Sequence, residues 1–324
     1  MDRPRVNVPL RTGGHVADAL AAGCPVVALE STLLAHGLPA GRNREVADRL
    51  ECTVRANGAV PATIAVLDGA AVAGCSPDEL DRLCSGEVAK LSRRDLGIAV
   101  ARGITGATTV AGTLAVAALA GIDVFATGGI GGVHRGTGWD ISADLNALAA
   151  TALLVTCSGV KSILDVGATL ERLETLSVPV LGYRTDAFAG FYRRDSGHPA
   201  PWRVDTPREA AAAFAAHRLL GGPAGLVLAN PVPAAQEMDA ELHDSALATG
   251  LDLLRRRGVR GKAVTPALLD HFHASTAGAS LEANIALVLA NAELAAQVAV
   301  ELSRLSPDGH APRAAGPGPP TGTG

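Results

Sequence analysis

The sequence predicts an α/β protein, a three-layer α/β/α sandwich around a largely parallel or mixed central sheet. Short runs rich in Val, Ile, Leu and Ala alternate with longer segments that carry helix start and stop signals. Apolar residues make up 48% of the 324 residues, which is ample for a core, and only 3% are aromatic. The core must therefore be built from Ala, Val, Leu and Ile.

The expected elements follow one another without a linker or an internal repeat. In the first part of the chain we expect a helix at 15–22, a strand at 25–29, a helix that ends at 57–58, strands at 60–67 and 70–74 joined by Asp68-Gly69, and a helix that starts at Ser76. Later we expect strands at 122–127, 153–156, 178–183 and 225–230, and helices at 109–120, 162–175, 206–220, 235–257, 267–275 and 280–305.

These elements predict one catalytic α/β domain over residues 15–305. Residues 1–14 are polar, contain Pro and Gly, and are expected to be flexible. The tail 306–324 is rich in Pro and Gly and is expected to be disordered.

Composition also argues against some classes of function. A net charge of −4 without a basic patch argues against a nucleic-acid groove and favours a small-molecule substrate. The five cysteines form no CxxC pair, which indicates reduced thiols in the cytoplasm and no structural zinc. The N-terminus lacks the apolar core of a signal peptide, and Gly, Thr and Asp interrupt the longest apolar stretch, 110–126. We therefore expect neither export nor a membrane span.

A glycine-rich stretch follows the predicted strand Ile122–Thr127. Five glycines lie within nine positions, at 128, 129, 131, 132 and 136. Glycines let backbone N–H groups approach a ligand closely, so a strand, a glycine loop and a helix together suit an anion or a sugar phosphate. Two carboxylates follow this loop, Asp140 and Asp144, with Ser142 between them.

Lysine usage singles out one residue after the next strand. Only three of the 28 basic residues are lysines, namely Lys90, Lys161 and Lys262. Lysine can lose its proton and attack a carbonyl carbon, whereas guanidinium stays protonated. Lys161 lies past a predicted strand end, where open α/β sheets bind ligands, so it is the candidate nucleophile. Compositional drift is the alternative explanation for so few lysines.

Further candidates have ordinary structural alternatives. Glu30 directly follows an apolar strand, which suits a buried acid or a helix-capping residue. Lys90 lies in a cationic cluster, KLSRRDL (90–96), that suits an anion or a solvated surface. Thr108 and Thr109 precede a helix, where threonine can seat a phosphate or cap the helix. The aromatic-rich segment 184–204 suits a lid or an oligomer contact.

Several long segments of the chain, over about residues 20–305, resemble pseudouridine-5′-phosphate glycosidases, which are related to the indigoidine synthase A-like proteins. The main segments are ALESTLLAHGLP (28–39), KLSRRDL (90–96), FATGGIGGVHRG…DISADL (125–145) and GVKSILD (159–165). Shorter ones are GYRTDAFAGFYRR (182–194), LANPVP (228–233), TPALL (265–269) and SLEANIALV (280–288).

The resemblance implies reversible cleavage of pseudouridine 5′-phosphate into uracil and ribose 5-phosphate. It also implies one divalent ion per subunit, usually Mn²⁺, and a homotrimer. By position, Lys161 matches the lysine that forms a covalent adduct with ribose C1′, Glu30 the proton donor and Asp140 the metal ligand. The matched substrate-binding positions are Lys90, Val110, Ser142, Ala143, Asp144 and Asn284. The loop 136–139 is about two residues shorter than is usual in the family.

The residue types suit this chemistry. A carbon leaving group cannot depart as a nitrogen base does, so two carboxylates alone are a poor template. A neutral lysine and an acid can break the bond through an imine. Two alternatives stay open: another Schiff-base sugar-phosphate lyase or aldolase, and a non-catalytic nucleotide-binding protein in which Lys161 only pairs with phosphate.

Overall fold

The fold is built on a mixed eleven-stranded sheet. The structure is a computed structural model that describes residues 10–136, 139–259 and 264–305. The sheet order is β1-β4-β3-β2-β7-β9-β13-β11-β12, and β5 and β6 join it through β3. All pairs are parallel except those that β3 makes with β4 and β6. The predicted α/β class with a largely parallel or mixed sheet is therefore confirmed.

The elements have the following bounds. The strands are β1 Leu10–Thr12, β2 Val26–Glu30, β3 Val60–Leu67, β4 Ala70–Ala73, β5 Ala89–Leu91, β6 Gly106–Thr108, β7 Val124–Ala126, β8 Val133–His134, β9 Leu154–Cys157, β10 Leu164–Asp165, β11 Val180–Tyr183, β12 Trp202–Val204 and β13 Leu226–Ala229. The helices are α1 Gly14–Ala21, α2 Thr32–His36, α3 Arg42–Ala56, α4 Pro77–Ser85, α5 Leu96–Ala101, α6 Val110–Ala120, α7 Ala143–Ala149, α8 Val166–Thr175, α9 Pro207–Leu219, α10 Ala240–Arg257, α11 Val264–Ser275 and α12 Ala279–Leu305.

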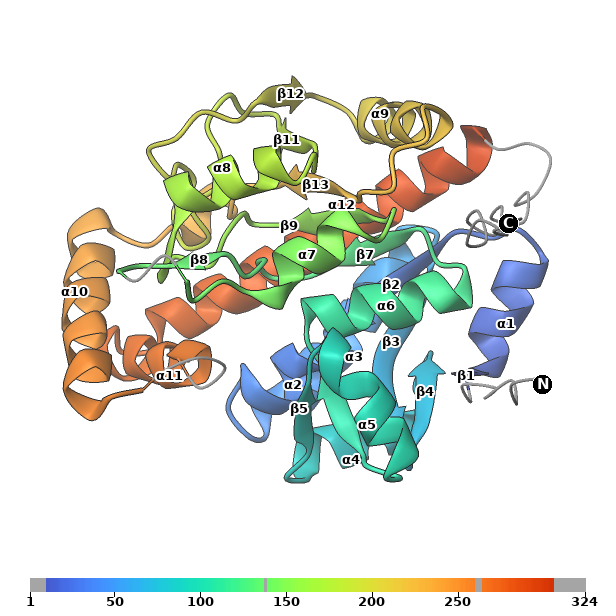
Figure 1. Cartoon of the computed structure of the whole chain (residues 1–324), viewed down its shortest axis with the longest axis horizontal. Coiled ribbons are helices and arrows are strands. Elements are labelled where there is room, and N and C mark those ends of the chain that lie inside the picture. The colour runs from blue at the N-terminus through green and yellow to red at the C-terminus, as the bar shows by residue number, and fades with distance from the viewer. Residues whose placement is uncertain (1–9, 137–138, 260–263, 306–324) are drawn as a thin grey trace, which may run out of the picture.

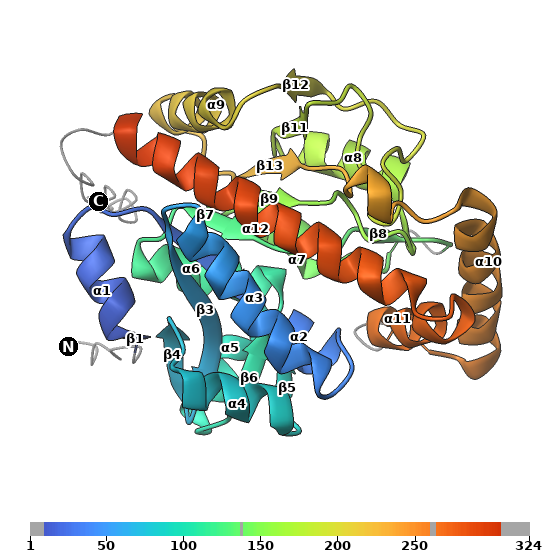
Figure 2. The same cartoon turned by 180° about the vertical axis from the view of Figure 1, so that it is seen from behind.

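Helices cover both faces of the sheet. α6, α7 and α8 lie in front of it in Figure 1, and α12 and α3 cross the opposite face in Figure 2. α12 runs along this second face and packs against α3, α9, β7 and β9. The helix is long and apolar enough to cross a membrane, but its buried side chains form part of the protein core.

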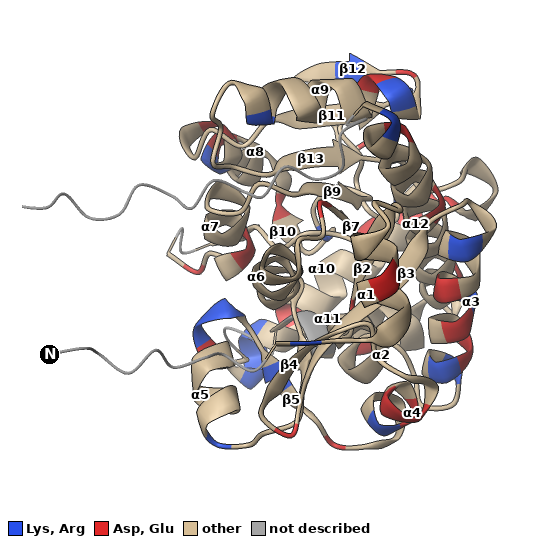
Figure 3. Cartoon of the chain, turned by 90° about the vertical axis from the view of Figure 1, so that its right-hand side faces the viewer, with Lys and Arg blue, Asp and Glu red and all other residues tan. Residues whose placement is uncertain are grey.

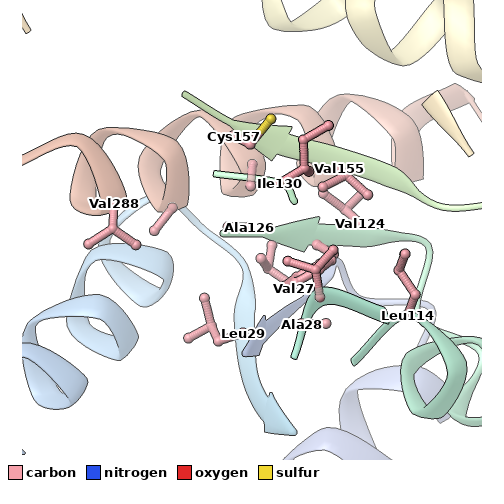
Figure 4. Close-up of a cluster of buried hydrophobic side chains, with 14 of the residues drawn as sticks. Val27, Ala28, Leu29, Leu114, Val124, Ala126, Ile130, Val155, Cys157 and Val288 are labelled. Atoms are coloured by element: carbon pink, nitrogen blue, oxygen red, sulfur yellow. The ribbon is translucent and has the colours of Figure 1, made fainter. Parts of the chain in front are cut away.

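Small aliphatic side chains fill the space between the layers. Figure 4 shows Val27 of β2, Val124 of β7 and Val155 of β9 in one cluster that also includes Leu114 of α6 and Val288 of α12. All five are 2% exposed or less. Acidic and basic residues are interspersed along the helices and loops, with few in the strands (Figure 3).

Most predicted elements are present, with shifts at their ends. The helix predicted to start at Ser76 is α4, and Ser76 forms a capping box with Glu79. Residues 10–14 were expected in a flexible segment, but β1 pairs with β4 and α1 already begins at Gly14. A helix from residue 162 is wrong, because 164–165 pair with β8 and Asp165 caps α8 at residue 166. Residues 1–9 and the tail 306–324 lie outside the described residues.

Candidate active site

Three neighbouring strands deliver polar side chains to one edge of the sheet. Glu30 is the last residue of β2, Thr127 directly follows β7, and Lys161 lies four residues after β9. β2, β7 and β9 are adjacent and parallel, so their carboxyl ends meet at the same edge. Residues separated by up to 131 positions in the sequence thereby face one site.

Glu30 is a buried acid. Its side chain accepts a hydrogen bond from the Thr127 hydroxyl, and the residue is only 7% exposed. Burial raises the pKa of Glu30, while the charge of Lys161 and the Thr127 hydrogen bond oppose this rise. A carboxyl group that keeps its proton to higher pH suits a proton donor.

Lys161 is held by the backbone of two loops. Its N–H donates to the Ile130 carbonyl at 3.1 Å, and the Ile130 N–H donates to the Gly159 carbonyl at 3.0 Å. Gly159 has a φ of +81°, and an added Cβ would lie 2.0 Å from the Ala189 carbonyl oxygen. Only glycine fits there. The half-buried Lys161 therefore lies in a loop whose backbone is held by hydrogen bonds and close packing.

The glycine loop permits close packing. The loop was predicted to suit an anion, but the Gly131 N–H does not serve one, because it donates to Asp144 Oδ2 at 2.9 Å. A Cβ on Gly131 would lie 2.3 Å from Ser142 Oγ, and one on Gly129 would lie 2.6 Å from the Phe191 ring. The glycines thus bring α7 and Phe191 against the loop.

Backbone N–H groups at the start of α6 donate to side chains of the protein itself. The second oxygen of Asp144 accepts from the Ala111 N–H at 2.9 Å, and Thr109 caps the helix through the Gly112 N–H. The Thr108 hydroxyl donates to the Ile64 carbonyl at 2.9 Å. The helix-capping interpretation therefore holds for Thr109, and Asp144 ties the glycine loop to α6.

A cavity of about 320 Å³ opens in front of Glu30 and Lys161. Lys90 and Arg94 bring positive charge to its wall, beside the start of α6. Arg93, from the same predicted cationic cluster, instead donates to Thr151 Oγ1 at 3.3 Å. The cavity is large and polar enough for a sugar phosphate.

A smaller apolar cavity of about 40 Å³ adjoins the first and shares Glu30, Lys90 and Lys161 with it. Leu33, Phe191 and Leu269 supply apolar walls.

Two polar side chains also line this smaller cavity, Asn284, which is 1% exposed, and His36. Asn284 Oδ1 and His36 Nε2 are buried and have no hydrogen-bond partner among the described residues. Burial lowers the pKa of His36. Such a slot suits a flat heterocycle with polar edges.

Asp140 is the predicted metal ligand. Its side chain is 39% exposed, and its Oδ2 lies 3.9 Å from Nδ1 of His134. Within the described parts of the chain, no three His, Cys, Asp or Glu side chains gather as a metal site. This donor set fits a hydrated divalent ion that is held by one carboxylate and otherwise by water.

Comparisons with known proteins assign the family. The model for indigoidine synthase A like proteins matches residues 15–301. The chain belongs to this family. A pseudouridine-5′-phosphate glycosidase from Salinispora tropica is 59% identical over 297 residues, with 90% of this chain and 91% of that protein covered. One from Streptomyces griseus is 54% identical, with 92% and 94% covered.

Solved structures of family relatives have the same fold. The prealnumycin C-glycosynthase AlnA in complex with ribulose 5-phosphate superposes with a TM-score of 0.86 at 39% identity, over 93% of this chain and 99% of that one. An indigoidine synthase A-like protein from Thermotoga maritima gives 0.85 at 35% identity, over 94% and 100%. The resemblance seen in the sequence motifs is thereby confirmed.

In this family member the predicted site residues converge. The larger cavity is lined by Glu30, Lys90, Val110, Asp140, Ser142, Ala143, Asp144 and Lys161, and the smaller one adds Asn284. Their individual roles stay predictions. Lys262 lies outside the described residues.

Other residues of the site are not indicated by the sequence. Thr127 and His36 carry no local signal beyond their place in the FATGGIGGVHRG and ALESTLLAHGLP segments, respectively. The aromatic segment was interpreted as a lid or an oligomer contact, yet Phe188, Phe191 and Tyr192 are at most 3% exposed, and only Trp202, at 71%, faces outward. Phe191 belongs to the site because its ring packs on Gly129.

Proposed function

We propose that this protein is a pseudouridine-5′-phosphate glycosidase that reversibly cleaves the bond between ribose C1′ and uracil C5. The observation that carries the proposal is the convergence of Lys161 and the buried acid Glu30 on one cavity beside an apolar slot. The relatives at 51–59% identity that bear this enzyme's name support it. The products are uracil and ribose 5-phosphate.

The chemistry begins with the sugar. The unprotonated Nζ of Lys161 attacks C1′, the bond from C1′ to the ring oxygen breaks, and that oxygen takes up the proton that the nitrogen loses. C1′ is then joined both to nitrogen and to uracil C5. Glu30 donates its proton to C5, the nitrogen lone pair forms an imine, and the C–C bond breaks. Water hydrolyses the imine, which releases ribose 5-phosphate and restores Lys161.

The two cavities divide the substrate between them. The apolar slot accepts the uracil ring, with Asn284 and His36 at its polar edges. The larger cavity accepts the ribose phosphate, with Lys90 and Arg94 facing the phosphate. Binding energy from the phosphate then serves to place C1′ beside Lys161, which is half-buried between the two cavities.

The proposal includes one Mn²⁺ per subunit, a homotrimer and a cytoplasmic location. Asp140 would hold the ion, and His134 lies close enough to orient a bound water. A bound divalent ion would supply positive charge that orients phosphate or sugar oxygens. Size-exclusion chromatography with light scattering tests the trimer, because a monomer or dimer at micromolar concentration would refute it.

Uracil release from pseudouridine 5′-phosphate, measured by chromatography with and without Mn²⁺, tests the function. Wild type should release uracil and ribose 5-phosphate in equal amounts, and Lys161→Ala should not. Adduct formation with ribose 5-phosphate without uracil release would favour another sugar-phosphate lyase. Binding of the nucleotide without turnover would favour a non-catalytic nucleotide-binding protein.

A further inference from the structure

A second asparagine lies on the same face of α12 as Asn284. Asn291 follows it by seven residues, which is two helical turns or about 10 Å along the axis. Asn291 is 0% exposed, lines neither cavity described above, and faces the carboxyl ends of the central strands. It is a buried polar group that the mechanism leaves without a role.

The amide of Asn291 joins the ends of three strands. Its Nδ2 lies 2.9 Å from the Thr127 carbonyl oxygen, 3.3 Å from that of Gly128 and 3.1 Å from Ser158 Oγ. Its Oδ1 accepts from Asn230 Nδ2 at 3.1 Å. These partners follow β7, β9 and β13, so one side chain contacts three consecutive strands of the sheet.

Backbone pairing alone already holds these strands together. The Thr127 N–H donates to the Thr156 carbonyl at 3.0 Å, and the Ser158 N–H donates to the Gly128 carbonyl at 2.8 Å. Asn291 therefore adds little to the pairing itself. It fixes the Thr127 and Gly128 carbonyl groups where β7 ends and the Ser158 hydroxyl where β9 ends.

Each of these two strand ends is close to a reacting residue. At the end of β7, the Thr127 hydroxyl donates a hydrogen bond to the Glu30 carboxyl group, and at the end of β9, Ser158 lies three residues before Lys161. A rotation at either strand end would move the acid and the amine relative to each other. Misplacement of reacting groups by about 1 Å can cost about a hundredfold in rate.

We propose that Asn291 is a positioning residue that sets the separation of Glu30 and Lys161 by clamping the ends of β7 and β9. The catalytic readout of this inference rests on the function proposed above. The clamp acts from behind the site, so its loss changes the rate of bond cleavage and spares substrate binding.

The test compares Asn291→Leu, which keeps the side-chain size and removes the hydrogen bonds, with Val298→Ala. Val298 is also buried on α12, two turns farther from the site, so its truncation destabilises the same helix. We expect Asn291→Leu to lower kcat for pseudouridine 5′-phosphate roughly ten- to a hundredfold with KM changed by less than about threefold. Val298→Ala should keep wild-type kcat at a similar loss of thermal stability.

Two further measurements keep the inference testable. If Asn291→Leu does not fold, Ser158→Ala removes one clamped hydroxyl and should still lower kcat with little change in KM. If wild type releases no uracil, the proposed function fails, but amine modification of Lys161 without substrate still reports the clamp. The modification, followed by peptide mass spectrometry, should be at least about threefold faster in Asn291→Leu because the loop opens more often.

Unchanged kcat in a folded Asn291→Leu variant would overturn the inference. So would unchanged kcat in Ser158→Ala where Asn291→Leu does not fold, or unchanged Lys161 modification where wild type is inactive. Equal loss of kcat in Val298→Ala would show that the effect is one of stability alone.

Discussion

Replacement of Glu30 by glutamine separates its catalytic role from its structural one. Glutamine keeps the shape of the side chain, and its carbonyl oxygen can still accept from the Thr127 hydroxyl. The substitution replaces the second carboxyl oxygen by an NH₂ group, so the side chain keeps its size and loses its acidic proton. We expect Glu30→Gln to fold and to lose two to four orders of magnitude in kcat, about 3–5 kcal/mol of transition-state stabilisation.

The pH dependence of stability and of activity in the wild-type protein follows from the burial of Glu30. Because burial raises the pKa of Glu30, the folded protein holds this proton more tightly than the unfolded chain. The stability that this group contributes is therefore complete below its unfolded pKa and is lost as the pH rises through the raised folded pKa. The proton-donor role predicts that kcat/KM for cleavage falls through the same folded pKa. Glu30→Gln should abolish the contribution of residue 30 to the pH dependence of stability.

Glu51 offers a matched control. It is 8% exposed and accepts a threonine hydrogen bond, from Thr63 Oγ1 at 3.0 Å, but it lies in α3 and lines neither cavity. Steady-state uracil release and thermal unfolding would be measured for Glu30→Gln and Glu51→Gln. Glu51→Gln should keep kcat within a few-fold of wild type. A Glu30→Gln variant with near wild-type kcat, or an equal loss in Glu51→Gln, would refute the reasoning.

Three further predictions concern the other charged residues of the site. Borohydride reduction with ribose 5-phosphate should attach the sugar to Lys161 and fail in Lys161→Ala; label on Lys90 alone, found by peptide mass spectrometry, would contradict the nucleophile assignment. Chelation should remove most activity, and Asp140→Ala should be inactive with or without added Mn²⁺; full turnover after exhaustive chelation would exclude the metal role. Lys90→Ala should lower kcat/KM for pseudouridine 5′-phosphate about ten- to a hundredfold, the scale of one charged contact, and barely change the slow reaction of unphosphorylated pseudouridine. Equal losses on both substrates would rule out a phosphate anchor.

Local sequence signals predicted most of the fold. Strand β3 has the predicted bounds, and Ser76 caps α4 as its Ser-Pro-Asp-Glu sequence indicates. The error at residues 162–165 has a tertiary cause. Leu164 pairs with His134, thirty positions earlier, and no local pattern shows such a contact. Apolar residues there are compatible with a helix or with a short strand, and the partner decides.

The sequence predicted those site residues whose side-chain type is unusual for their position in a strand or loop. A carboxylate at the end of an apolar strand and a rare lysine after another strand are visible in the sequence, and Glu30 and Lys161 do share a cavity. Thr127 and Asn291 were not predictable, because their importance depends on partners 97 and 164 positions away. A threonine after a strand and an asparagine in a helix are ordinary residues until those partners are known.

The two buried carboxylates of the site show why position alone does not assign an acid. Both oxygens of Asp144 accept backbone N–H groups, from Ala111 and Gly131, so its carboxylate joins α6 to the glycine loop. The Glu30 side chain has only the Thr127 hydroxyl as its hydrogen-bond partner among the described residues and is buried at the end of β2, near the charges of Lys161 and Lys90. Burial first, and the negative charge of Asp144 to a lesser degree, raise the pKa of Glu30. The same geometry that commits Asp144 to the backbone thus helps Glu30 to keep the proton that the reaction requires.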